Sequence, residues 1–124
     1  MLPPHNAGRT VGVTARQNGE SVVLTVSGEL DLDSVGPLAT ALTHSGESVT
    51  GPVVVDLSAV GFADSTTVNV LLQARAALGP RLRLARPSAF VRRLFAVIGL
   101  ETALPLYETV EAALTADAGE REVR

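Results

Sequence analysis

The sequence predicts an α/β domain in which a mixed sheet of four to five strands begins with a hairpin and is flanked by about four helices. Alternating apolar and polar residues run up to and away from Asn18-Gly19, a pair typical of hairpin turns. Further on, the apolar, β-branched run 53–57 suits a strand buried on both faces, and a helical pattern follows over 68–78. Shorter strand and helix patterns alternate after it, which favours a layered domain.

The N-terminal half predicts two strands and a helix. Alternation places the strands at 11–15 and 21–27. The helix is predicted over about 35–43, with Asp33 or Ser34 as the N-cap, because both side chains can accept a hydrogen bond from the first free amides of a helix. Gly46 is expected to stand beyond its end.

The central helix should begin within the run Asp64-Ser65-Thr66-Thr67, since these side chains favour caps over helix interiors. Gly79-Pro80 should end it. The remaining patterns are typical of a strand, a helix, a short extended segment and a last helix capped by Thr109. These elements are predicted over 81–85, 89–98, 104–107 and 110–116.

The 124 residues form one domain by size, with 46% hydrophobic and 19% charged residues. We predict a folded segment over 11–116, a disordered N-terminal tail over 1–10 and a flexible C-terminal tail over 117–124. The absence of cysteine fits a reducing compartment, so we expect a cytoplasmic protein. No apolar run reaches the roughly 18 residues that a bilayer requires, so membrane insertion is not expected. The net charge of −3 and scattered arginines argue against nucleic acid as a partner.

Two motifs resemble a known family. Residues 54–65 follow the pattern Val-Val-Asp-Leu-Ser-x-Val-x-Phe-x-Asp-Ser, and residues 28–31 read Gly-Glu-Leu-Asp. Both are similar to signatures of STAS domains, in particular those of bacterial anti-sigma factor antagonists, also called anti-anti-sigma factors. The resemblance covers roughly residues 11–116 and implies the STAS fold.

The resemblance implies a regulatory role for Ser65. In this family the serine directly after the motif aspartate is the phosphoacceptor for a serine kinase that doubles as the anti-sigma factor. Unmodified, the protein would bind that partner and regulate sigma-factor-dependent transcription; phosphorylated on Ser65, it would let go, and a serine phosphatase would reset it. From the residues alone, Ser65 can equally serve only as a helix cap.

The resemblance to the family also implies other candidate partner-binding residues. Asp64 would help to shape the site, and Asp31 would contribute from the adjacent loop, although each can be merely a structural residue. Thr66-Thr67-Val68-Asn69 stands where the family usually has Ser-Gly-Leu-Gly, so Thr67 and Asn69 are expected to add bulk to the partner surface. Helical spacing places Thr66, Asn69 and Gln73 on the outer face of the helix, which is a candidate docking face or an ordinary solvated one.

No catalytic motif is present, and enzymatic activity is not expected. His5 and His44 have no partners at ligand spacing, so metal binding is not expected, and no cofactor is implied because ATP would belong to the kinase. One alternative is a non-switching STAS subunit of a larger complex, such as a lipid-transport ATPase. A small-ligand or nucleotide sensor is a third possibility, for which the sequence offers no specific pocket residues.

Overall fold

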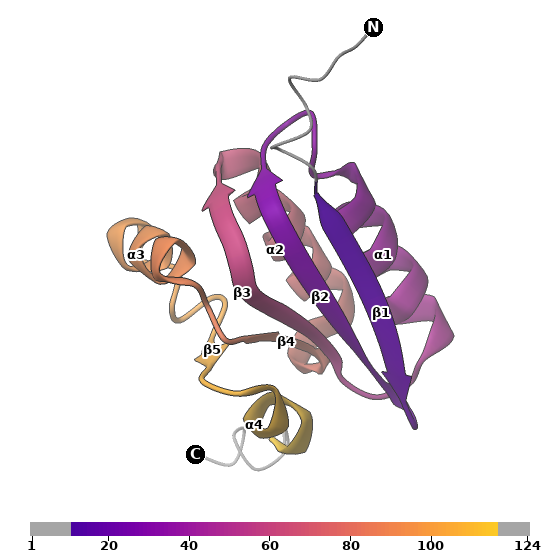
Figure 1. Ribbon diagram of the computed structural model, residues 1–124. Helices are drawn as coiled ribbons and strands as arrows, with labels where there is room; N and C mark the ends of the chain where they lie inside the picture. Colours follow the sequence, from indigo (N-terminus) through magenta and orange to yellow (C-terminus); the bar gives the residue numbers. More distant parts are fainter. Residues whose placement is uncertain (1–10, 117–124) are drawn as a thin grey trace, which may run out of the picture.

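The computed structural model describes residues 11–116, so the predicted tails at 1–10 and 117–124 lie outside the described residues. One five-stranded sheet has the order β1-β2-β3-β4-β5 (Figure 1). The strands are β1 (Gly12–Asn18), β2 (Ser21–Leu30), β3 (Val53–Ala63), β4 (Leu82–Ala85) and β5 (Leu106–Tyr107). The first pair is antiparallel and the others are parallel, which confirms the mixed sheet and its opening hairpin.

Residues 11–116 also contain four α-helices and one 3-10 turn. They are α1 (Gly36–Ser48), α2 (Ser65–Leu78), η2 (Gly79–Arg81), α3 (Ala89–Ile98) and α4 (Val110–Thr115). The bounds predicted for α3 agree with the structure, and those of α2 and α4 agree to within a few residues. Thr109 caps α4 as predicted, since its side chain accepts a hydrogen bond from the amide of Ala112.

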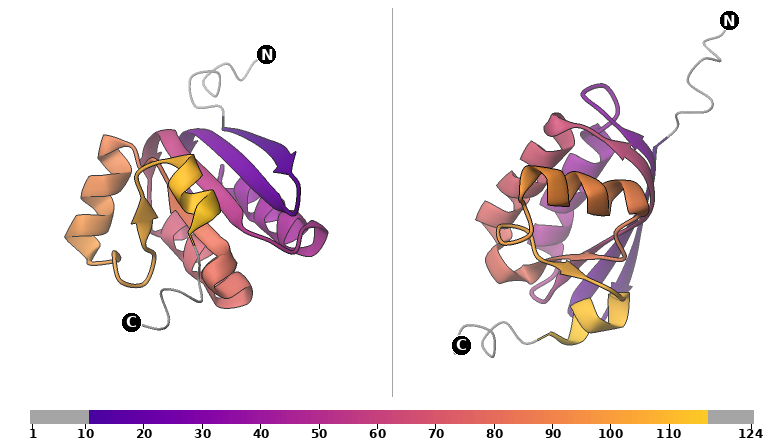
Figure 2. Two further views of the ribbon diagram at one scale, coloured as in Figure 1. Left: turned by 90° about the horizontal axis from the view of Figure 1, so that it is seen from below. Right: turned by 90° about the vertical axis from the view of Figure 1, so that its left-hand side faces the viewer.

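The sheet separates two apolar clusters of unequal size, because neighbouring residues of a strand point to opposite faces. The larger cluster lies under α1, α2 and α3, which supply residues such as Leu38, Leu71 and Phe95. The smaller one gathers Val23, Val54 and Ala85 beneath α4. Figure 2 shows α4 on the side of the sheet away from α1 and α2. Among residues 11–116, α4 is the helix that packs on this second face.

β3 is longer than the predicted run 53–57 and continues to Ala63. The sequence beyond Leu57 has the small and polar residues of a loop, yet it pairs with the last part of β2. Irregularities interrupt the register between Thr25 and Ser27 and between Gly28 and Glu29. The pairing ends with Leu30 opposite Ala63, so the segments that follow both strands leave the same edge of the sheet.

The predicted N-cap of α1 is wrong. Val35 occupies the cap position and makes no side-chain cap hydrogen bond, because Asp31 and Ser34 bond to each other in the preceding turn. Gly46 does not end the helix either. A Cβ atom at Gly46 would lie 2.7 Å from Leu78 Cδ2, so the glycine lets α1 pass close to α2.

Gly79 and Gly99 end the two following helices as predicted. Both adopt positive φ angles, of 61° and 80° respectively, which L-residues with a side chain rarely adopt. At each of these positions the amide donates back to a carbonyl of the last helical turn. The C-terminal ends of α2 and α3 are therefore defined by these glycines.

Candidate partner-binding site

Ser65 is the first residue of α2 and is exposed to solvent. The helix is capped by the preceding residue: Asp64 has an extended backbone, and its Oδ1 accepts a hydrogen bond of 3.2 Å from the amide of Thr67. A carboxylate at this position also interacts favourably with the positive end of the helix dipole. Because Asp64 supplies the cap, the hydroxyl of Ser65 is not needed for that structural role.

Thr67 does not lie where the sequence suggested. Its side chain is only 2% exposed, so the expectation that it adds bulk to the outer surface is wrong. The hydroxyl donates a 3.1 Å hydrogen bond to the carbonyl oxygen of Leu30 at the end of β2. Helical spacing alone could not reveal this contact, because the two residues lie 37 positions apart in the chain.

Asp31 lies in a compact turn between β2 and α1. Its Oδ1 accepts hydrogen bonds from the amides of Asp33 and Ser34, at 3.0 and 3.1 Å. Ser34 Oγ lies 2.7 Å from the carbonyl oxygen of Glu29, which returns the turn to the end of β2. The side chain of Leu32, in the middle of this turn, is 74% exposed. We call residues 31–35 the Asp31 loop.

The structure brings most of the predicted partner-binding residues to one region. Asp31 and Asp64 follow the paired ends of β2 and β3, and the Thr67–Leu30 hydrogen bond links their two segments. Asn69 and Gln73 are exposed on α2, and Thr66 is partly exposed. Gln73 also lines a hollow of about 370 Å³ between α1 and α2. Whether any of these residues touches a partner stays a prediction.

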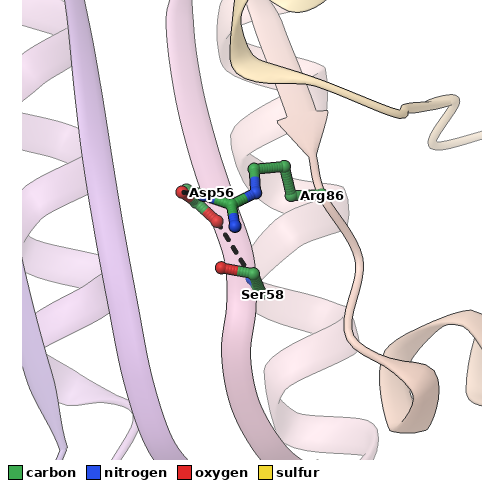
Figure 3. Close-up of polar contacts among 3 residues, drawn as sticks. All are labelled: Asp56, Ser58 and Arg86. Carbon is green, nitrogen blue, oxygen red and sulfur yellow. Dashed lines mark hydrogen bonds and ion pairs between the residues drawn. The ribbon is translucent and has the colours of Figure 1, made fainter.

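A partly buried ion pair lies on the α4 side of the sheet and was not predicted from the sequence. Asp56 on β3 is 6% exposed, and its Oδ2 lies 3.2 Å from Arg86 Nη1, just after β4 (Figure 3). Its Oδ1 accepts a 3.0 Å hydrogen bond from the amide of Ser58. The signal available in the sequence was a single carboxylate at the end of an otherwise apolar strand. The pair joins β3 to the residue that directly follows β4.

The arginines in the described part of the chain mostly bond within the fold. Carbonyl oxygens accept hydrogen bonds from Arg75, Arg81 and Arg83, and carboxylates pair with Arg86 and Arg92. The spacing Arg81-x-Arg83-x-x-Arg86 therefore sends three side chains to three different partners and forms no basic patch. A protein that binds nucleic acid by counterion release needs such a patch.

Within residues 11–116, no three acidic, histidine or cysteine side chains lie together as a metal ion would require. Over the same range, none of the helices is both long enough and apolar enough to cross a bilayer. What the described surface does offer is an exposed hydroxyl and neighbouring polar side chains at the sheet edge. Residues 11–116 form a layered α/β module with a candidate partner-binding site where β2 and β3 end.

Comparison with known proteins identifies this module. A family model described as "Mlab, STAS domain" matches residues 13–115, so the chain belongs to the STAS domain family. A relative named anti-sigma-F factor antagonist RsfB, from Mycobacterium tuberculosis, is 29% identical over 119 residues, which cover 94% of this chain and 97% of the relative.

Solved structures show the same fold. The crystal structure of an anti-sigma factor antagonist from Mycobacterium paratuberculosis superposes with a TM-score of 0.77 at 28% identity, covering 86% of this chain and 92% of the other. An anti-sigma-factor antagonist (STAS) domain protein from Planctomyces limnophilus gives a TM-score of 0.71 at 17% identity, with 82% and 94% coverage. The second likeness shows the fold alone. Both names describe antagonists of anti-sigma factors, and such antagonists are regulatory proteins and not enzymes.

Proposed function

We propose that this protein is a cytoplasmic anti-sigma factor antagonist that binds an anti-sigma factor while Ser65 is unmodified and releases it when Ser65 is phosphorylated. The kinase would be the anti-sigma factor itself, and a serine phosphatase would restore the binding form. The observation that carries the proposal is the exposed hydroxyl of Ser65 beside a helix cap that another residue supplies. The full-length relatives named as antagonists support the partner class.

The physical basis of the switch is a difference between what the fold and the partner tolerate. Phosphorylation adds about −1.5 to −2 charge and three acceptor oxygens. At the start of α2 this charge faces free amides and the positive end of the helix dipole, which stabilises a negative group by about 0.3–1 kcal/mol. A partner surface packed on Ser65 has no such compensation unless it pairs the phosphate. Each ~1.4 kcal/mol of lost binding free energy lowers the affinity tenfold.

The test uses two variants of Ser65 in a pull-down with a purified kinase-type anti-sigma factor from the same genome. Ser65→Ala removes the acceptor hydroxyl and should keep binding, whereas Ser65→Asp adds a permanent charge and should abolish it. Thr102→Asp is the matched control, because Thr102 is exposed between α3 and β5, at the opposite edge of the sheet. Equal binding by the two Ser65 variants would contradict the switch.

A phosphorylation assay adds a second line of evidence. Incubation of the wild-type protein with the anti-sigma factor and ATP should add one phosphate to the wild type and none to Ser65→Ala. If the protein binds its partner but accepts no phosphate, it acts as a non-switching STAS subunit. In that case a larger complex, such as a lipid-transport ATPase, becomes the better candidate for its partner.

A further inference from the structure

The hydroxyl of Thr67 joins two segments that are far apart in the sequence. Thr67 is the third residue of α2, and its Oγ1 donates to the carbonyl oxygen of Leu30, the last residue of β2. Both Thr67 and Leu30 are buried, at 2% and 0% exposure. A buried carbonyl oxygen that loses its donor is left without compensation from water, so loss of this hydrogen bond is costly.

The Asp31 loop begins directly after this bonded carbonyl. Asp31 Oδ1 holds the amides of Asp33 and Ser34, and the carbonyl oxygen of Asp31 accepts a 2.9 Å hydrogen bond from the amide of Val35. The loop is therefore internally ordered, and the Thr67 hydroxyl fixes its first end to the start of α2. Leu32 is exposed on this ordered backbone.

We infer that Thr67 is a positioning residue that holds the Asp31 loop against α2, and that Leu32 is the apolar contact which this loop offers to the protein partner covering Ser65. The inference rests on the proposed function for the identity of that partner. An ordered loop loses little conformational entropy on binding, so a large side chain presented on it contributes more of its contact energy to affinity. A few such anchors usually dominate a protein interface.

The hydrogen bond to Leu30 gives a structural role to the threonine that stands here in place of the usual glycine of the STAS pattern. Glycine, the residue usual there in the family, has no side chain with which to reach Leu30. In this chain the Thr67 hydroxyl links the helix to the loop by a hydrogen bond of 3.1 Å. Thr67 thus contributes to partner binding from within the core, without contacting the partner.

A first experiment tests the positioning role without any partner. Native-state hydrogen exchange would be measured at the amides of Asp33 and Ser34 in the wild type, in Thr67→Val and in Thr67→Ser. Thr67→Val keeps the shape but removes the donor, and exchange at both amides should accelerate about tenfold. Thr67→Ser restores a hydroxyl and should stay within about twofold of the wild type.

The amides of Gly99 and Leu100 serve as internal controls, because both donate to the carbonyl oxygen of Phe95 at the far end of α3. They should exchange at wild-type rates in each variant. If they accelerate as much as Asp33 and Ser34, the substitution has lowered global stability and the positioning role is refuted. Unchanged exchange at Asp33 and Ser34 in Thr67→Val would refute it as well.

A second experiment measures affinity for the same purified anti-sigma factor that is used to test Ser65. Leu32→Ala should weaken binding at least tenfold, and Val97→Ala should leave it within about twofold. Val97, on α3, is the matched control because it is an apolar residue of similar exposure: 78%, compared with 74% for Leu32. Thr67→Val should also weaken binding, and Thr67→Ser should restore it. Equal affinity of Leu32→Ala and the wild type would overturn the contact.

The two proposals fail in different ways. If Ser65→Asp does not release the partner, the phosphorylation switch fails, and the exchange rates at Asp33 and Ser34 still decide the role of Thr67. If Ser65→Asp releases the partner while Leu32→Ala binds like the wild type, the inference about Leu32 fails and the proposed function stands.

Discussion

Replacing Arg86 by alanine tests whether the ion pair with Asp56 stabilises the fold. The substitution leaves the Asp56 side chain, which is 8% exposed, with the amide of Ser58 as its donor. The side chain of Arg86 is 53% exposed, so the pair is neither fully buried nor free in water. The free-energy cost of losing the pair should therefore lie between the cost for a fully buried pair and that for an exposed pair.

The magnitude follows from those limits. Removing one partner of a fully buried pair costs about 3–5 kcal/mol, and an exposed pair contributes about 0–1 kcal/mol. We expect Arg86→Ala to lower the free energy of unfolding by about 2 kcal/mol, a substantial part of the roughly 5–15 kcal/mol of a typical domain. Asp56→Asn, added to Arg86→Ala, should recover part of this loss, because a neutral amide is less costly to bury than an unpaired carboxylate.

The backbone of Arg86 supplies an internal comparison. Arg86 has a φ angle of 53° and is the one non-glycine residue with positive φ in the described part of the chain. Glycine adopts this conformation without the strain of about 1 kcal/mol that a Cβ atom brings. Arg86→Gly should therefore be less destabilising than Arg86→Ala by about 1 kcal/mol. Both variants lose the same guanidinium, so their difference reports the backbone alone.

Urea unfolding followed by far-UV circular dichroism measures these differences, provided that the variants share one dependence of the free energy on urea concentration. An Arg86→Ala midpoint equal to that of the wild type would show that the ion pair adds no net stability. A glycine variant no more stable than the alanine variant would refute the assignment of strain to the backbone at this position.

Two further substitutions test local features of the fold. Asp64→Ala removes the cap of α2 and should lower the free energy of unfolding by about 1 kcal/mol in the same urea assay; an unchanged midpoint would contradict the capping role. Gly51→Ala would place a Cβ atom 2.7 Å from the carbonyl oxygen of Glu20 and should lower the melting temperature, whereas Gly36→Ala, with open space around it, should not. Equal melting temperatures for both would refute the steric argument.

Most of the fold could be predicted from the sequence because its local signals agree with the tertiary structure. The helix 89–98 combines an apolar face with a terminal glycine, and the structure has the same bounds. The N-terminal hairpin likewise follows from alternation around Asn18-Gly19. In both cases the signal lies within a short stretch of sequence, and the tertiary structure agrees with it.

The errors arose where tertiary contacts override local preference. Residues 58–63 contain glycine and small residues, yet they form strand because β2 offers them a pairing edge. Gly46 lies within α1 because the neighbouring Leu78 leaves no room for a larger residue without rearrangement. Neither cause is visible within a window of a few residues.

In the candidate site, too, some features could be predicted from local sequence and others depend on tertiary contacts. The exposure of Ser65 follows from its place before an amphipathic helix, and its role in phosphorylation remains a prediction. Thr67 was expected on the same surface because it stands where the STAS pattern usually has a glycine. Its burial depends on Leu30, which lies 37 residues away, and only the folded structure brings the two together.

The short helix α4, which packs on the second face of the sheet, has a practical consequence for anyone who shortens this chain. α4 covers the apolar cluster around Val23 and Val54, and its carbonyl oxygens at Ala113 and Ala116 accept hydrogen bonds from Arg83. A fragment truncated before Val110 would expose that cluster to water and remove two of the carbonyl acceptors of the Arg83 guanidinium. Such a fragment should aggregate on expression, so truncations for crystallisation or display should retain α4 through Ala116.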